Sequence, residues 1–78
     1  MSTIKLNLYS TTYCHLCEQA QSLLLNLPKD SLTIVEIAHD EQLLIAYGVR
    51  IPVLQRLDTK AELNWPFNAD DIALFLAN

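Results

Sequence analysis

The chain has 78 residues, 51% of them hydrophobic, and a formal net charge of −4. One domain spanning residues 1–78 fits this length, and so high an apolar content with a single glycine excludes a disordered or low-complexity chain. The acidic balance argues against nucleic acid and membranes as partners. The apolar stretches are far shorter than the roughly 20 residues that span a bilayer, and the sequence does not begin with the pattern of a secretory signal. We therefore expect a cytoplasmic protein.

The first half of the sequence predicts a strand, a helix and a second strand. Residues 4–9 alternate apolar and polar side chains, which is strand periodicity. Residues 14–27 change to helical spacing, and residues 28–30 end this helix. Its predicted apolar face consists of Leu16, Ala20, Leu23, Leu24 and Leu27. Residues 32–37 are rich in β-branched side chains and predict a strand, which gives a parallel βαβ unit with a right-handed crossover.

A short helix and a hairpin follow. His39 or Asp40 can cap the short helix at its start, and Gly48 is expected to end it in the left-handed conformation that glycine adopts at little cost. Residues 52–57 and 61–65 have the pattern of two hairpin strands joined by a three-residue turn.

A last helix closes the chain. Asn68 can cap it, and Asp70 and Asp71 lie in its first turn, where negative charge is favoured. The predicted order is therefore β-α-β-α-β-β-α, which belongs to the α/β class.

The two cysteines, Cys14 and Cys17, are adjacent in a C-x-x-C pattern. Two cysteines are too few for a secreted disulfide scaffold, and a bridge between them would close a loop too small to restrain the unfolded chain much. Residues three apart on a helix have Cα atoms roughly 5 Å apart, which a disulfide tolerates. Reversible redox chemistry therefore explains the pair better than stability does.

The position of the pair predicts different roles for the two sulfurs. Cys14 lies at a helix start, where unpaired backbone N–H groups and the helix dipole favour a thiolate. Cys17 lies one turn deeper and should be less exposed. We therefore predict that Cys14 attacks a disulfide and that Cys17 resolves the mixed disulfide. His15, if protonated, would add to the stabilisation of the thiolate, or it is simply an exposed residue.

The segment from Tyr13 to Cys17 opening a helix after a strand, followed later by Ile51 and Pro52, resembles the thioredoxin-fold family. The short length is similar to the glutaredoxin branch, and residues 47–54 with the Trp-Pro-Phe segment at 65–67 look most like the small bacterial glutaredoxin-like proteins. The resemblance implies a thioredoxin fold, a four-stranded mixed sheet with helices on both faces.

The same resemblance implies the substrate site. In this family the proline at the position of Pro52 is cis and faces the cysteines, and the backbone of Ile51 would pair with a bound peptide or with glutathione. The predicted substrate-binding residues are Tyr13, Ile51, Pro52, Asp70 and Asp71. The implied function is a thiol–disulfide oxidoreductase that reduces protein or small-molecule disulfides.

The chain departs from the glutaredoxin pattern at residues that bear on glutathione. His15 and Leu16 stand where proline and tyrosine are common, and residues 65–69 replace a Gly-Gly pair that lets glutathione approach the backbone. We therefore predict no bound cofactor and treat glutathione as the less favoured thiol. The expected partner of this monomer is a disulfide-containing protein or a low-molecular-weight disulfide, and the sequence does not name the reductant.

The cysteine pair has two further interpretations. It could consist of two structural thiols that happen to lie three residues apart. A structural zinc site needs four ligands, and only His15 and His39 remain to complete one, with His15 on another side of the helix. The location of the pair at a helix start after a strand favours redox chemistry over both, so we predict no metal.

The remaining site residues also have structural alternatives. Pro52 could be an ordinary proline at a strand entry, and Asp70 and Asp71 could do no more than complement the helix dipole. Trp65 is either part of the core or a wall of the cleft. Arg50 is either a carboxylate ligand or a solvated charge.

Two other functions remain open. The chain could be a redox-responsive interaction module, in which the state of the C-x-x-C pair only switches the affinity for a partner. It could also hold an iron–sulfur cluster shared by two subunits through Cys14, as some glutaredoxins do with glutathione.

Overall fold

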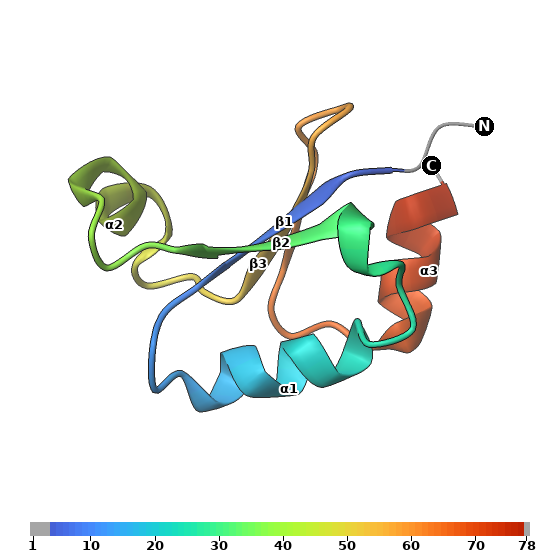
Figure 1. Cartoon of the computed structure of the whole chain (residues 1–78), viewed down its shortest axis with the longest axis horizontal. Helices are drawn as coiled ribbons and strands as arrows, with labels where there is room; N and C mark the ends of the chain where they lie inside the picture. The colour runs from blue at the N-terminus through green and yellow to red at the C-terminus, as the bar shows by residue number, and fades with distance from the viewer. Residues whose placement is uncertain (1–3, 78) are drawn as a thin grey trace.

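The computed structural model describes residues 4–77, and its strands form one mixed sheet. The strands are β1 (Leu6–Ser10), β2 (Leu32–Glu36), β3 (Val53–Arg56) and β4 (Glu62–Asn64). Their order across the sheet is β2-β1-β3-β4. β1 is parallel to β2 and antiparallel to β3, and β3 is antiparallel to β4. Hydrophobic β1 thus lies inside the sheet with a strand on each side (Figure 1).

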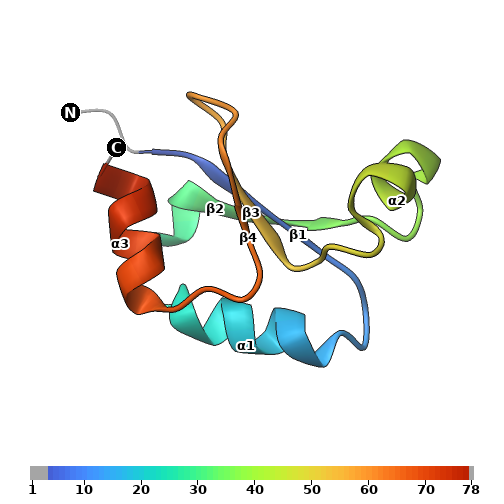
Figure 2. The same ribbon diagram turned by 180° about the vertical axis from the view of Figure 1, so that it is seen from behind.

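Three helices complete the described part of the chain. They are α1 (His15–Leu23), α2 (Glu41–Tyr47) and α3 (Ala69–Ala77), and a short 3₁₀ helix, η1 (Lys29–Ser31), precedes β2. Figures 1 and 2 show α1 and α3 on the same side of the strands and α2 at one end of the sheet. The predicted order β-α-β-α-β-β-α is confirmed. Within residues 4–77, no helix has the length and apolar character required to cross a membrane.

The buried side chains form one hydrophobic cluster on each face of the sheet, because successive strand residues point in opposite directions. The larger cluster lies under α1 and α3 and contains Leu6, Leu8, Ala20, Leu24, Leu54, Phe67 and Ile72. The smaller cluster lies under α2 and contains Tyr9, Ile37, Tyr47 and Val53. Helices therefore pack on both faces, as predicted, although α2 covers only the end of its face.

The buried face of α1 differs from the predicted one. Cys17, Ala20 and Leu24 are buried, whereas Leu16 and Leu23 are exposed. The helix also ends at Leu23, earlier than predicted, and turns lead to η1. The many leucines of this stretch allow more than one apolar stripe. The stripe that is buried in the structure places the small side chain of Ala20 against the sheet and the side chain of Cys17 in the protein interior.

Helix α2 begins as predicted but ends differently. The side chain of Asp40 caps its start by accepting hydrogen bonds from the N–H groups of Gln42 (3.0 Å) and Leu43 (3.2 Å). The prediction of a left-handed Gly48 is wrong, because its φ is −52°. Glycine is still needed there, since a Cβ atom would collide with the carbonyl oxygen of Leu44.

Candidate functional site

Cys14 and Cys17 form a disulfide at the start of α1, with Cα atoms 5.2 Å apart. Cys14 is the N-cap residue of the helix, and its Sγ atom accepts a hydrogen bond from the backbone N–H of Cys17 at 3.1 Å. This amide is one of the helix-start donors that have no partner within the helix. In the reduced protein the same donor would face a Cys14 thiolate and stabilise its negative charge.

The two sulfurs differ in accessibility, as predicted from their positions. Cys14 is half-buried, whereas the side chain of Cys17 lies within the protein and the residue is only 1% exposed. An external disulfide can therefore approach Cys14 but not Cys17. This asymmetry is what an attacking thiol and a resolving thiol require.

Glu36 holds the loop that precedes Cys14. One carboxylate oxygen of Glu36 accepts hydrogen bonds from the backbone N–H (3.0 Å) and the hydroxyl (2.9 Å) of Thr12, and the other accepts from the N–H of Ala38 (3.0 Å). The hydrogen bonds from Ala38, Thr11 and Thr12 lower the pKa of Glu36 to about 2. Sequence reasoning missed this residue, although a carboxylate at the end of the strand beside the loop is a usable signal.

Tyr13 lies in this loop with a φ of +64°, in the left-handed region that a non-glycine residue rarely occupies. Its side chain is 99% exposed. The neighbouring Thr12 is hydrogen-bonded to Glu36 through both its backbone N–H and its hydroxyl. The tyrosine residue is thus exposed to solvent immediately before the cysteine pair.

A groove with a volume of about 350 Å³ is lined in part by Leu16, the residue before Cys17, although neither cysteine is among its lining residues. Its lining residues come from α1, from the segment between α2 and β3, and from the end of β4: Leu16, Val49, Arg50, Ile51, Asn64 and Trp65. The groove brings Ile51 together with Leu16 of the C-x-x-C segment. The peptide bond between Ile51 and Pro52 is cis, and Pro52 is buried.

Trp65, which follows β4, lines this groove. Its ring packs edge-on against Phe67, with ring centroids 5.0 Å apart and an interplanar angle of 78°. Phe67 belongs to the larger core cluster, so the core fixes the position of the tryptophan. The bond between Trp65 and Pro66 is also cis, which the sequence did not predict.

His15, Asp70 and Asp71 lie outside the residues that line the groove. His15 contacts the carboxylate of Glu18 at 3.6 Å on the exposed surface of α1. Asp71 accepts a hydrogen bond from the N–H of Asn68 (3.0 Å), and the side chain of Asn68 accepts one from the N–H of Asp71 (2.9 Å). This reciprocal pair caps α3. Asp70 is exposed in the first turn of α3.

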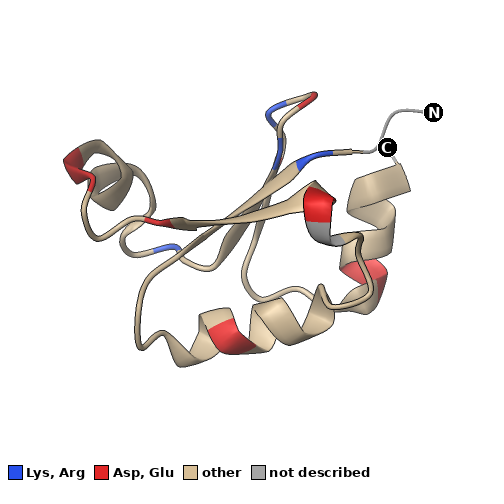
Figure 3. Ribbon diagram, in the orientation of Figure 1, with Lys and Arg blue, Asp and Glu red and all other residues tan. Residues whose placement is uncertain are grey.

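One charged side chain, that of Arg50, is among the residues that line the groove. Each of the three helices carries acidic residues in its first turn and no basic residue in its last turn (Figure 3). Arg50 is the basic residue among those that line the groove, and it is paired with Glu62 at 3.3 Å. The rest of the lining is apolar, apart from Asn64.

For the described residues 4–77, no cluster of three or more potential metal ligands occurs.

The comparisons with known proteins agree with this geometry. A sequence model of the glutaredoxin-like domain (DUF836) matches residues 5–77. The X-ray structure of XcR50 from X. campestris, a Northeast Structural Genomics target, has a TM-score of 0.83 and 39% sequence identity, and the match covers 92% of this chain and 95% of that one. The solution structure of XcR50 gives a TM-score of 0.81 with 38% identity over 94% and 92% of the two chains.

A third similar structure is the solution structure of Ne2328 from Nitrosomonas europaea. It has a TM-score of 0.79 and 30% identity, and the match covers 96% of this chain and 93% of that one. The search of curated proteins found no match.

Proposed function

Because the chain belongs to the glutaredoxin-like domain family (DUF836), we propose that it is a thiol–disulfide oxidoreductase with Cys14 as the nucleophile and Cys17 as the resolving thiol. The single observation that carries this proposal is the unequal burial of a C-x-x-C pair whose outer sulfur accepts a backbone hydrogen bond at a helix start. Membership of the family alone names no reaction.

The proposed reaction consists of two exchange steps. The Cys14 thiolate attacks one sulfur of the substrate disulfide, a Cys14–substrate bond forms, and the other substrate sulfur leaves as a thiolate that takes a proton from water. Cys17 then loses its proton to water and attacks Sγ of Cys14. The Cys14–Cys17 disulfide forms and the second substrate thiol is released. The substrate gains two electrons, the cysteine pair loses two, and an external thiol reductant reverses the exchange to complete the cycle.

The groove, which includes Leu16 of the C-x-x-C segment, supports a role in holding the substrate. Leu16, Ile51 and Trp65 offer an apolar surface, and Tyr13 lies exposed at the same end of α1. The lone groove cation, Arg50, is already paired with Glu62. A glutathione molecule carries two carboxylates, so this lining favours disulfides of proteins over glutathione disulfide.

Backbone pairing at Ile51 would differ from a simple added strand. The N–H of Ile51 already donates to the carbonyl oxygen of Tyr47 at 3.1 Å. A bound peptide would therefore either use the Ile51 carbonyl alone or take over this donor from Tyr47. The proposed substrate pairing through Ile51 thus involves the end of α2.

Trapping tests the proposed function. A Cys17→Ser variant incubated with a peptide disulfide is expected to accumulate a mixed disulfide through Cys14, because the resolving sulfur is gone. The matched Cys14→Ser variant should trap far less, since Cys17 is buried. Absence of a trapped adduct, together with wild-type protein that is inert toward disulfides, would defeat the proposal.

A redox-responsive interaction module is the second candidate function. Two exposed apolar residues favour it, because they suit contact with a protein partner: Tyr13, which precedes Cys14, and Val49, which lines the groove together with Leu16. Sustained multiple turnover with a thiol reductant would argue against this role. Tight binding that depends on the redox state, without turnover, would support it.

A further inference from the structure

We propose that Glu62 is a positioning residue for the substrate groove, acting through Tyr47 and Arg50 to fix the two walls of the groove against each other. This inference rests on the proposed function and adds to it a site on the opposite face of the sheet from α1.

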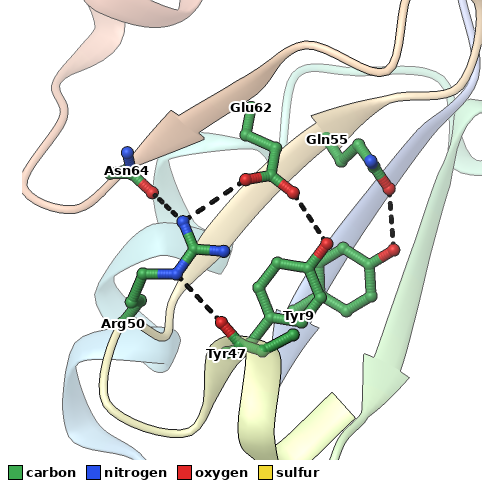
Figure 4. Close-up of polar contacts among 7 residues, drawn as sticks. Tyr9, Tyr47, Arg50, Gln55, Glu62 and Asn64 are labelled. Carbon is green, nitrogen blue, oxygen red and sulfur yellow. Dashed lines mark hydrogen bonds and ion pairs between the residues drawn. The ribbon is translucent and has the colours of Figure 1, made fainter. Parts of the chain in front are cut away.

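Glu62 lies on β4, and each of its two carboxylate oxygens accepts a hydrogen bond from a different residue at or just after the end of α2. Its Oε2 atom accepts a hydrogen bond from the hydroxyl of Tyr47 at 2.7 Å, and its Oε1 atom accepts one from Nη1 of Arg50 at 3.3 Å (Figure 4). Tyr47 ends α2, and Arg50 directly precedes Ile51 in the groove wall. The carboxylate therefore brackets the short segment that leads to Ile51.

Arg50 connects the two walls directly. Its Nη1 atom also donates to the side-chain oxygen of Asn64 at 3.2 Å, and both residues line the groove. Trp65, which follows Asn64, belongs to the same wall. The distance between the Ile51 wall and the Trp65 wall is thus set by a guanidinium that Glu62 holds in place.

The end of α2 gives this arrangement a firm base. Nε of Arg50 donates to the carbonyl oxygen of Ala46 at 3.0 Å, and the guanidinium carbon lies 4.9 Å from the centre of the Tyr47 ring. The N–H groups of Arg50 (2.8 Å) and Ile51 (3.1 Å) both donate to the carbonyl oxygen of Tyr47. The position of Tyr47 therefore determines the backbone at Ile51.

Tyr47 is itself held by stacking against the ring of Tyr9. The two rings stack with centroids 4.1 Å apart and an interplanar angle of 11°, and the hydroxyl of Tyr9 donates to Gln55 at 2.7 Å (Figure 4). The hydrogen bond to Glu62 and burial both raise the pKa of Tyr47 above its ordinary value, so its hydroxyl remains a donor at neutral pH. The two tyrosine hydroxyls thus make hydrogen bonds of the same length, that of Tyr47 to the Glu62 carboxylate and that of Tyr9 to the Gln55 amide oxygen.

This symmetry provides a matched pair of variants. Tyr47→Phe and Tyr9→Phe each remove one hydroxyl and one 2.7 Å hydrogen bond from the same ring stack. We expect Tyr47→Phe to raise KM for a peptide disulfide about five-fold with kcat within about two-fold, because the groove is displaced while the sulfur chemistry is untouched. Tyr9→Phe should leave KM within about two-fold of wild type.

Glu62→Gln supplies a second variant in case Tyr47→Phe does not fold, because the side chain of Glu62 is partly exposed. It should raise KM to a similar extent, because the amide of glutamine has one acceptor oxygen and cannot accept from both Tyr47 and Arg50. The double variant should raise KM by less than the product of the two single increases, because both changes act on the contacts of Glu62. The pH midpoint of Cys14 alkylation should stay at the wild-type value in all of these variants. Faster hydrogen exchange of the Ile51 amide should accompany the KM change but not occur in Tyr9→Phe.

The inference fails by itself if wild-type protein turns over and Tyr47→Phe and Tyr9→Phe have the same KM. It also fails if the loss appears in kcat or in the alkylation midpoint, since Glu62 would then influence the sulfurs. Wild-type protein that reduces no disulfide would overturn the proposed function first, and this positioning role with it.

Discussion

The backbone N–H of Cys17 donates a hydrogen bond to Sγ of Cys14 at 3.1 Å across the first turn of α1. Cys14 thus occupies the capping position that serine, threonine or aspartate usually fills, with its sulfur as the acceptor. A sulfur in this position gains most from the hydrogen bond when it is negatively charged. The cap of the helix and the proposed nucleophile are therefore the same atom.

Cys14 should react as a thiolate at lower pH than a free cysteine. In a Cys17→Ser variant, which keeps the donating N–H, we expect the midpoint of iodoacetamide alkylation below about pH 8.5, the value for an unperturbed thiol. Cys17 in a Cys14→Ser variant should be alkylated slowly because it is buried. A Cys14 midpoint at or above the free-thiol value would contradict the capping argument.

Acid should destabilise the fold through Glu36. Its pKa is about 2 in the folded protein and near the ordinary value of 4.5 in the unfolded chain, so its stabilising contribution is complete above pH 4.5. The contribution is lost as the pH falls from about 4.5 to about 2. Urea unfolding measured across this range should show a smaller pH dependence in Glu36→Gln than in wild type. Equal slopes for the two proteins would refute the assignment.

Tyr13 should be replaceable by glycine with a gain in stability. Its φ of +64° places its Cβ atom unfavourably, and glycine carries no such penalty. We expect Tyr13→Gly to raise the free energy of unfolding by up to about 1 kcal/mol. Tyr13→Ala, which keeps the Cβ atom, is the control and should give no gain. Thermal unfolding of both variants decides the matter, and a gain in the alanine variant alone would be contrary to this account.

Two neighbouring leucines test which face of α1 and its following turn is buried. Leu24 is 2% exposed and Leu25 is 79% exposed. Leu24→Ala should lower the free energy of unfolding by about 2–5 kcal/mol, because it leaves a cavity in the larger core cluster. Leu25→Ala should change it by no more than about 0.5 kcal/mol. Similar losses in urea unfolding for the two variants would mean that the helix is rotated from the described orientation.

The sequence is most informative where local chemistry decides the structure. The alternation in residues 4–9 predicts β1, and Asp40 is one of two candidate caps that the sequence offers for α2. The C-x-x-C spacing at a helix start predicts both the proximity of the sulfurs and the deeper burial of Cys17. Each of these features depends on residues within a few positions of one another.

The features that the sequence does not predict depend on distant residues or on a choice among equal ones. Glu62 meets Tyr47 and Arg50 across 15 and 12 positions of the chain, and nothing in its local pattern distinguishes it from a solvated strand residue. Leucine at positions 16, 23 and 24 satisfies two helix faces equally well, so only packing against the sheet can select one. The pattern around Gly48 predicts a left-handed helix end, but a close approach to Leu44 is what demands glycine.

Arg50 also completes α2, because the helix has no basic residue in its last turn and Nε of Arg50 donates to the Ala46 carbonyl. The guanidinium that gives the groove its positive charge is thus the same group that fastens the carboxyl end of this helix. An engineer who exchanged Arg50 to alter ligand selectivity would loosen α2 at the same time. At this position, selectivity and architecture cannot be tuned independently.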